Sequence, residues 1–460
     1  MLSPVKMRTT IILFALGLLT ASCKKENVFT NSPDARLVFS TDSVSFDTIF
    51  TGLSSTTARI RIFNTARNAV RISEIRLYGG SGSCYKMNVN GTASDYLENV
   101  KLQGGDSLTV FIKAAISPNS QKKPFLIVDS IAFISNGNRQ VVRLTAYGQN
   151  VNVIKKAVIS TNTIWDDQIP YLIYDTLLIP QNRILTIKKG CRVYFNKNAK
   201  LEVEGTLKVE GTLQEPVTFA GSRLERIYRN EAGQWGGIHF KNSSSENAIN
   251  YAVIQNAVTG LRADASLPQD EKPKLLLTNS IIKNMQAAGI AAYNSSIAAF
   301  NNLMFNCGQY LIRTENGGSY NLKQNTFANY SFFFARYFPS LSFNTEDKKL
   351  NLVLMNNIIW GSLQHELEIN GNEADKAGLQ AENNIIRTTQ DLFNSGNNII
   401  NIDPLFALPA EGNFKLKEES PAREAGQNLE NDLYYEPFLS TDLLGTKRIF
   451  PSSAGCYNFF

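Results

Sequence analysis

The stretch LVLMNNII, residues 352–359, places apolar residues on both sides of a short polar step, and this arrangement recurs along the chain. The recurring segments start 28, 22, 23, 32 and 27 residues apart. They are YAVIQN (251–256), NSIIKN (279–284), NNLMFN (301–306), QNTFAN (324–329), NNIIWG (356–361) and NNIIR (383–387). One strand–corner–strand unit cannot bury its apolar face alone, whereas stacked units pair their strands in parallel and enclose a continuous interior. The spacing therefore predicts a right-handed parallel β-helix.

Asparagine recurs at the corner of these units, at Asn279, Asn301, Asn356 and Asn383. Asparagine tolerates the left-handed backbone conformation of a corner, and stacked amides can hydrogen-bond along a ladder. We therefore interpret the four residues as structural rather than ligand-binding. We expect Asn301 and Asn356 to lie at equivalent corners, each between two strands whose apolar residues share one interior.

Residues 1–22 have the pattern of a secretion signal: two basic residues, an apolar stretch too short to span a bilayer, and small residues before Cys23. The Ala-Ser-Cys step resembles the lipobox of bacterial lipoproteins, in which the cysteine becomes the acylated first residue. An ordinary signal peptide with an incidental cysteine is the alternative. An acylated Cys23 would hold the protein on a membrane surface, with residues 23–36 as a tether.

The overall composition, with 43% hydrophobic and 19% charged residues, is that of a folded chain. The formal net charge of +6 is small for 460 residues, so it gives no reason to expect nucleic acid as a partner and leaves an acidic glycan open. Four cysteines beyond Cys23 are too scattered for a metal knuckle or a dense disulfide framework. We interpret them, Cys84, Cys191, Cys307 and Cys456, mostly as buried thiols.

Residues 37–150 contain short alternating segments separated by turn residues, the pattern of a β-sandwich. The segments include ARIRIFN (58–64), AVRISEIRLYG (69–79), DSLTVFIKAA (106–115) and DSIAFISN (129–136). Their order resembles the immunoglobulin-like modules found beside larger domains in bacterial surface proteins. Such modules act as spacers or binders, and the fold alone decides neither.

Residues 151–460 resemble the right-handed β-helix proteins of the pectin-lyase-like superfamily, especially surface lipoproteins of Bacteroidota. The first coils of that family are matched by residues 183–221, from RILTIKKGCRVYF to EPVTFAG, and by QWGGIHF (234–240). The family's closing segment is matched in order by DPLF (403–406), GNFKL (412–416), SPAREAG (420–426), DLLGTKR (442–448) and GCY (455–457). The resemblance implies an all-β protein whose C-terminal segment, from about residue 403, covers the last coil.

The catalytic patterns of the related enzymes are not found in this sequence. Polygalacturonase-like members use several aspartates with a His-Gly pair and an Arg-x-Lys stretch, and pectate-lyase-like members use calcium-binding carboxylates with an arginine base. The adjacent Asp166 and Asp167 have no partner aspartates at recognisable spacing, so a solvated turn is expected there. His239 alternates with apolar neighbours and should point outward beside Lys241. We expect no cofactor, and no motif supports calcium.

Glu366 and Glu368 in QHELEIN (364–370) form the most suggestive polar pair. On one strand they would share the outer face about 7 Å apart, a separation compatible with glycosidic acid–base chemistry or a calcium site. The alternative is two solvated glutamates. We expect the latter, with no basic residue or third carboxylate in contact.

The run NYSFFFARYFPSLSF (329–343) is rich in aromatic residues. Aromatic rings exposed along a groove stack on sugar rings, so Tyr330, Tyr337 and Phe338 are candidates for a carbohydrate-binding platform. Because so many exposed aromatics would promote aggregation, the alternative is an inserted loop packed against the wall of the β-helix.

The leading functional hypothesis is a membrane-anchored surface lipoprotein that binds glycan or acts in adhesion. The alternatives are a polysaccharide lyase or glycoside hydrolase on the same scaffold, and a structural surface protein. The expected partners are a membrane, through the lipid anchor, and a polysaccharide, and we expect a monomer. The expected location is the outer membrane or cell surface, with the periplasmic face as the alternative.

Overall fold

The computed structural model describes residues 28–265, 272–333, 335–346 and 348–459. Cys23, the predicted lipidation site, and the predicted signal peptide lie outside the described residues. The chain divides into two compact units, one containing residues up to Pro118 with Phe125–Gly148, and the other containing Asn119–Pro124 with Gln149–Phe460. Within the described ranges no helix is long and apolar enough to cross a membrane.

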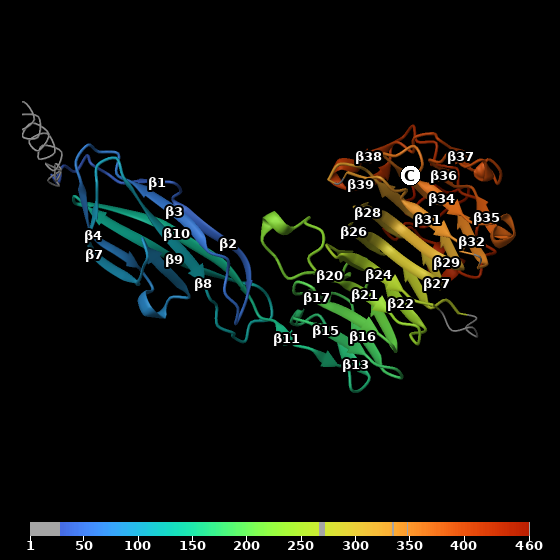
Figure 1. The fold of residues 1–460 in the computed structure, drawn as a ribbon, viewed down its shortest axis with the longest axis horizontal. Coiled ribbons are helices and arrows are strands. Elements are labelled where there is room, and N and C mark those ends of the chain that lie inside the picture. Colours follow the sequence, from blue (N-terminus) through green and yellow to red (C-terminus); the bar gives the residue numbers. More distant parts are fainter. Residues whose placement is uncertain (1–27, 266–271, 334, 347, 460) are drawn as a thin grey trace, which may run out of the picture. The chain divides into compact units, whose positions relative to one another are not determined.

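The first unit consists of two five-stranded sheets around one apolar core (Figure 1). One sheet has the order β1 (Val38–Phe39), β3 (Ala58–Phe63), β8 (Ser107–Ala114), β5 (Tyr85–Val89) and β6 (Thr92–Ala93). The other has the order β2 (Ser43–Phe50), β10 (Asn138–Gln149), β9 (Phe125–Ser135), β4 (Val70–Leu77) and β7 (Tyr96–Leu102). Alternate residues such as Ile60, Ile72 and Val110 are fully buried and come from both sheets. The alternating sequence pattern therefore places one side of each sheet on the shared core.

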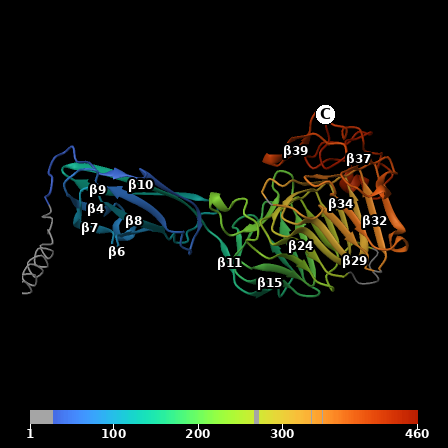
Figure 2. The same cartoon turned by 45° about the horizontal axis from the view of Figure 1, so that its top comes forward.

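The second unit is a parallel β-helix with three strand faces, which we call faces A, B and C (Figures 1 and 2). Face A contains β12 (Ala157–Val158), β15 (Thr176–Ile179), β18 (Lys200–Val203), β21 (Gly237–Phe240), β24 (Thr259–Ala263), the first halves of β27 (Ala288–Phe300) and β29 (Tyr310–Lys323), β31 (Leu341–Asn344) and β34 (Leu367–Asn370). Face B contains β13 (Thr163–Trp165), β16 (Ile184–Lys188), β19 (Thr206–Glu210), β22 (Asn247–Asn250), β25 (Leu275–Thr278), the second halves of β27 and β29, β32 (Leu350–Met355) and β35 (Gly378–Glu382). Face C contains β11 (Asn152–Ile154), β14 (Tyr171–Ile173), β17 (Arg192–Phe195), β20 (Val217–Gly221), β23 (Ala252–Gln255), β26 (Ile281–Met285), β28 (Leu303–Cys307), β30 (Thr326–Asn329), β33 (Ile358–Gly361), β36 (Ile385–Ile386) and β37 (Ile399–Ile400). The structure thus confirms the parallel solenoid that the repeat predicts.

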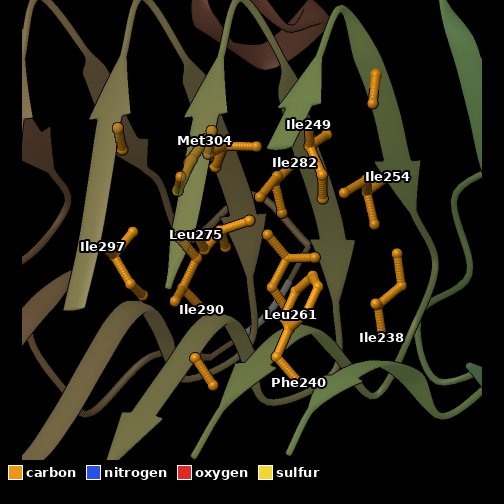
Figure 3. Packing of buried hydrophobic residues seen from close by; sticks show 14 of the residues in the cluster. Ile238, Phe240, Ile249, Ile254, Leu261, Leu275, Ile282, Ile290, Ile297 and Met304 are labelled. Atoms are coloured by element: carbon orange, nitrogen blue, oxygen red, sulfur yellow. The ribbon is translucent and has the colours of Figure 1, made fainter. Parts of the chain in front are cut away.

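Equivalent apolar residues of successive coils stack inside the β-helix (Figure 3). On face A, Ile238 is in register with Leu261, and Leu261 with Ile290. On face C, Ile254 is in register with Ile282, and Ile282 with Met304. Residues from all three faces meet in one cluster, so each coil buries its apolar side only because its neighbours are present.

The predicted corner residues lie where face B passes into face C. Asn301 separates β27 from β28 with φ = 55°, and Asn356 separates β32 from β33 with φ = 56°. Asn279 and Asn383 have φ values of 50° and 55°. The left-handed corner conformation and the equivalence of Asn301 and Asn356 are therefore confirmed.

The amide ladder lies one residue after the predicted positions. Asn302, Asn325, Asn357 and Asn384 are fully buried, and each donates from Nδ2 to Oδ1 of the next member at 3.0, 3.0, 3.0 and 2.9 Å, with half-buried Asn398 accepting the last bond. The same Nδ2 groups also donate to backbone carbonyl groups of the preceding coil, as Asn357 does to Leu322 at 2.8 Å. At this corner the left-handed residues Asn301, Asn356 and Asn383 are thus not the ones whose amides stack, because their side chains contact another segment.

That other segment is the C-terminal one, which lies along the B–C corner over several coils. Asn301 donates to the carbonyl oxygens of Phe438 and Thr441 at 2.6 and 2.8 Å. Asn356 exchanges two hydrogen bonds with the backbone of Gln427, and Asn383 donates to Ala425. The segment contains a hairpin of β38 (Phe406–Leu408) and β39 (Asn413–Leu416) and packs apolar residues against the outer sides of faces B and C.

The helical segments that the structure describes are single turns. They are the 3₁₀ turns Gly80–Gly82, Arg226–Tyr228, Glu373–Lys376, Asp391–Phe393 and Pro409–Glu411 and the π-helical turn Tyr435–Leu439. The fold is therefore all-β. Cys191, Cys307 and Cys456 are buried free thiols and Cys84 is half-buried, as predicted. Burial raises the pKa of the three buried thiols to about 12, so they remain protonated at neutral pH.

Candidate functional site

Glu366 is a buried structural residue, which corrects the expectation that it is solvated. Its side chain is fully buried and forms a bidentate ion pair with Arg336, at 2.9 and 2.7 Å. It also accepts hydrogen bonds from the backbone N–H groups of Ser340 and Leu363 at 3.0 and 2.8 Å. The prediction failed because strand β34 begins at Leu367, so the alternation of a strand does not extend to Glu366.

The Arg336–Glu366 pair holds the aromatic segment inserted between β30 and β31, of which the structure describes residues 330–333 and 335–340. Arg336 donates to the carbonyl oxygens of Asn329 and Phe338, before and near the end of this segment. Gly361 leaves the space that the carboxylate needs, since a Cβ atom there would lie 2.2 Å from Oε1 of Glu366. With its lone pairs satisfied in this way, Glu366 is not available for acid–base chemistry.

Glu368 is half-buried on the outer side of face A and has separate partners. It accepts a hydrogen bond from Asn370 and one at 3.4 Å from Ser342, and its carboxylate lies 3.7 Å from Nε2 of His365. The structure therefore does not bring Glu366 and Glu368 together as a pair of exposed carboxylates.

The aromatic candidates are also divided between two places. Tyr330 is half-buried and packs toward face C, where its ring stacks on Phe332 at 5.1 Å. Phe338 is 42% exposed and packs against Tyr310 of face A at 5.1 Å. Tyr337 is 82% exposed. The three predicted residues therefore do not form one platform, although two different surfaces use parts of the segment.

A continuous row of side chains follows the outer side of face A across seven coils. The strand registers align Glu202, His239, Arg262, Ala291, Arg313, Ser342 and Glu368. Tyr293 and Glu315 are in register two positions further along their strands. His239 thus points outward, as predicted. Sequence reasoning missed the row because each member is an ordinary polar residue until the register aligns them.

An open depression with a volume of about 310 Å³ lies on this row. Its floor contains Ala291, whose small side chain lies between Arg262 and Arg313. Tyr293, 49% exposed, and Glu315 also line it. We call this surface the face A depression. It combines an exposed aromatic ring with charged hydrogen-bonding groups.

The charged groups of the face A depression are held in place by one another. Asp264 accepts from Nε2 of His239 at 2.7 Å and from Nε of Arg262 at 3.0 Å. The Arg313 guanidinium group pairs with Glu315 and lies over the ring of Tyr310, 5.4 Å from its centroid. Long side chains fixed in this way lose less conformational entropy when a ligand binds.

Two titratable groups beside the depression have shifted pKa values. Burial lowers the pKa of His239, helped by the nearby Lys241 and Arg262 and opposed by Asp264. Burial alone would raise the pKa of Asp264, but its hydrogen bonds and charge interactions with His239 and Arg262 lower it overall. Asp264 is therefore ionised at neutral pH, suited to accept hydrogen bonds rather than to donate a proton.

Among the residues that the structure describes, no group of three or more His, Cys, Asp or Glu side chains could hold a metal ion. Asp166 and Asp167 are exposed in a bend after β13, as predicted.

Comparison with known proteins supports the β-helix over part of the chain. A family model described as the right-handed beta helix region matches residues 145–329. No curated protein matches the sequence.

Several solved structures are distantly similar to this chain. The catalytic unit of a GH87 α-1,3-glucanase from Streptomyces thermodiastaticus strain HF3-3 is 12% identical, with a TM-score of 0.29, over 68% of this chain and 63% of that one. A family 123 glycoside hydrolase from Clostridium perfringens is 9% identical, with a TM-score of 0.18, over 24% of this chain and 25% of that one. The periplasmic chaperone SfaE is 10% identical, with a TM-score of 0.17, over 25% of this chain and 58% of that one. The chain therefore spans between a quarter and 63% of these proteins, and similarities this weak carry no functional argument.

Proposed function

We propose that the protein is a lipid-anchored surface protein that binds a glycan on face A of its β-helix. The observation that carries the proposal is the face A depression, where the exposed ring of Tyr293 lies among Arg262, Arg313 and Glu315. A sugar ring has an apolar face and a rim of hydroxyl groups. The aromatic ring of this surface can stack on the apolar face, and its fixed polar groups can hydrogen-bond to the hydroxyl groups.

The geometry of the row favours an extended glycan. Neighbouring strands of a sheet lie about 4.8 Å apart, so equivalent side chains repeat regularly along the solenoid. Charged or hydroxyl-bearing residues continue the row on both sides of the depression, from Glu202 to Glu368. A polymer with a regular repeat could contact several coils at once, which raises its affinity without any single strong contact.

Anchoring is the second part of the proposal. Acylation of Cys23 would place the protein on the outer membrane or cell surface, as in the lipoproteins of Bacteroidota that the sequence resembles. We propose separately that the protein is a monomer. The two-sheet unit follows Cys23 in the chain and precedes the β-helix. We infer that it is an immunoglobulin-like spacer, because its two sheets share one apolar core.

A catalytic role has little support in this geometry. Glu366 and Glu368 are the candidate catalytic residues of a lyase or hydrolase. Because Glu366 forms a buried ion pair with Arg336, it cannot serve as the acid or the base. Asp264, the carboxylate beside the depression, is held ionised by His239 and Arg262. Binding without cleavage is therefore the function that we propose, in glycan capture or adhesion.

The anchor is tested by Cys23→Ser. We expect the variant to be exported but to be extracted from membranes without detergent, and to incorporate no labelled fatty acid, because the acyl chains supply the membrane affinity. Fatty-acid labelling of the variant equal to that of the unaltered protein would contradict the assignment.

The glycan site is tested by Tyr293→Ala. We expect affinity for the bound polysaccharide to fall about tenfold, since an aromatic–ligand contact contributes on the order of 1 kcal/mol beyond buried area. Isothermal titration calorimetry measures the effect. Tyr147→Ala is a matched control, because Tyr147 is 47% exposed in the first unit. Equal affinities of the two variants would place binding elsewhere.

A further inference from the structure

A second depression lies on face C, between the inserted segment and the C-terminal hairpin. We call it the face C pocket. It has a volume of about 110 Å³, and its lining includes Lys283, Asn306, Tyr330, Phe332, Phe414 and the acidic residue Glu411. Strands β26 and β28, the segment after β30 and the hairpin β38–β39 each contribute to it, so it forms only when the insertion and the C-terminal segment are both in place.

The walls of the face C pocket are aromatic. The rings of Tyr330 and Phe332 are nearly parallel, at an interplanar angle of 9° and a centroid distance of 5.1 Å. Phe414 packs against Tyr330 at 6.4 Å and against Phe305 at 5.0 Å. Burial raises the pKa of Tyr330, so its hydroxyl group stays protonated. Phe332 is 50% exposed, which leaves an apolar ring face accessible at the opening.

A second stack of amides ends at the pocket. Asn306 donates from Nδ2 to Asn284, and Asn284 donates to Asn256 at 3.3 Å. In the next coil Asn329 is turned toward the backbone of Cys307, so it does not continue the stack. The Oδ1 atom of Asn306 is left without a hydrogen-bond partner, although this residue is only 7% exposed. A buried acceptor of this kind favours a ligand that brings a donor.

Lys283 supplies a positive charge to the same pocket. It is half-buried, and within the described residues it forms no ion pair. Burial, helped by the like charge of Arg229, lowers its pKa. Glu411 also lines the pocket but is not joined to Lys283 by an ion pair among the described residues. The ammonium group lies 5.9 Å from the ring centroid of Phe305. A cation that is partly desolvated without a counter-ion favours an anionic ligand group.

We propose that the face C pocket binds a single sugar ring that carries a carboxylate, separately from the face A depression. The apolar face of the ring would stack on Phe332 at the opening. A ring hydroxyl group would donate to Oδ1 of Asn306, and the carboxylate would accept from Lys283. The proposal rests on the proposed function for the class of ligand. It adds a site on face C, whereas the predicted platform residue Phe338 packs on face A.

The test compares methyl glycosides of uronic acids with the matching neutral hexosides, titrated into the full protein and followed by saturation-transfer NMR. We expect the uronides to bind about tenfold more tightly, the typical gain from one charge-assisted hydrogen bond. Lys283→Gln should abolish this preference while leaving the affinity for the neutral glycosides unchanged, and Lys283→Arg should restore most of it. Phe332→Ala should weaken both ligands about fivefold or more through the lost stacking contact.

Controls separate this site from the face A depression. Tyr293→Ala should leave the binding of the methyl uronides unchanged, and thermal unfolding shows that each variant is folded. Equal binding of charged and neutral glycosides, unaffected by Lys283→Gln, would overturn the proposal. The proposal would also be overturned if the protein bound neither glycoside but still bound polysaccharide through Tyr293. That result would leave the proposed function intact.

Discussion

Replacing Arg336 by alanine lowers the free energy of unfolding by about 3–5 kcal/mol, because the change leaves Glu366 buried without its counter-ion. Both side chains are fully buried, and Arg336 also donates to the backbone carbonyl oxygens of Asn329 and Phe338, before and near the end of the aromatic segment. Urea unfolding followed by tryptophan fluorescence measures the loss. Limited proteolysis gives a second readout, because segment 330–340 should become accessible to cleavage first.

Glu368→Gln is the matched control for this experiment. Glu368 lies two residues from Glu366 but is half-buried on the outer surface, where charge removal typically costs less than about 0.5 kcal/mol. Arg336→Ala and Glu368→Gln with equal stabilities would show that the buried pair does not hold the segment.

Replacing Asn357 by alanine lowers the free energy of unfolding by about 3 kcal/mol or more, since it interrupts the amide ladder at its centre and leaves buried polar groups unpaired. The Oδ1 atom of Asn357 accepts from the backbone N–H and from Nδ2 of Asn325, and its own Nδ2 donates to Leu322 and Asn384. Urea unfolding again measures the effect.

Asn394→Ala is the control for the ladder, because Asn394 is exposed and its side chain makes one hydrogen bond with the residues that the structure describes, to Asp391. We expect it to change stability by about 0.5 kcal/mol or less. A loss at Asn357 no larger than the loss at Asn394 would refute the structural role of the ladder.

The solenoid could be predicted from the sequence because its cause is local and repeated. Apolar residues alternate on each side of a corner asparagine, and every coil repeats the pattern, so the strand pairing follows from stacking alone. The sequence predicts that stacked asparagine amides form a ladder, but it does not show which asparagines form it. Which of two adjacent asparagines turns inward depends on the backbone at the corner, where Asn356 is left-handed and Asn357 is not.

The site could not be predicted because its residues come from neighbouring coils that lie far apart in the sequence. Glu366 forms its ion pair with Arg336, thirty positions earlier, and no periodic sequence pattern relates the two residues. A single basic residue within an aromatic run was the available signal, since a charge in such a run needs a partner when it is buried. The face A depression depends on a small residue, Ala291, in register between two arginines, which becomes visible only when the strands are aligned.

The central claim, that face A binds a glycan without cleaving it, is tested most directly by one measurement. The purified protein and its Tyr293→Ala/Arg313→Gln variant are applied to a glycan array, and each bound polysaccharide is then incubated with the protein and assayed for reducing ends and unsaturated uronates. The account predicts binding to at least one polysaccharide, loss of that binding in the variant, and no released product. Product formed by the unaltered protein, or binding that survives in the variant, would contradict it.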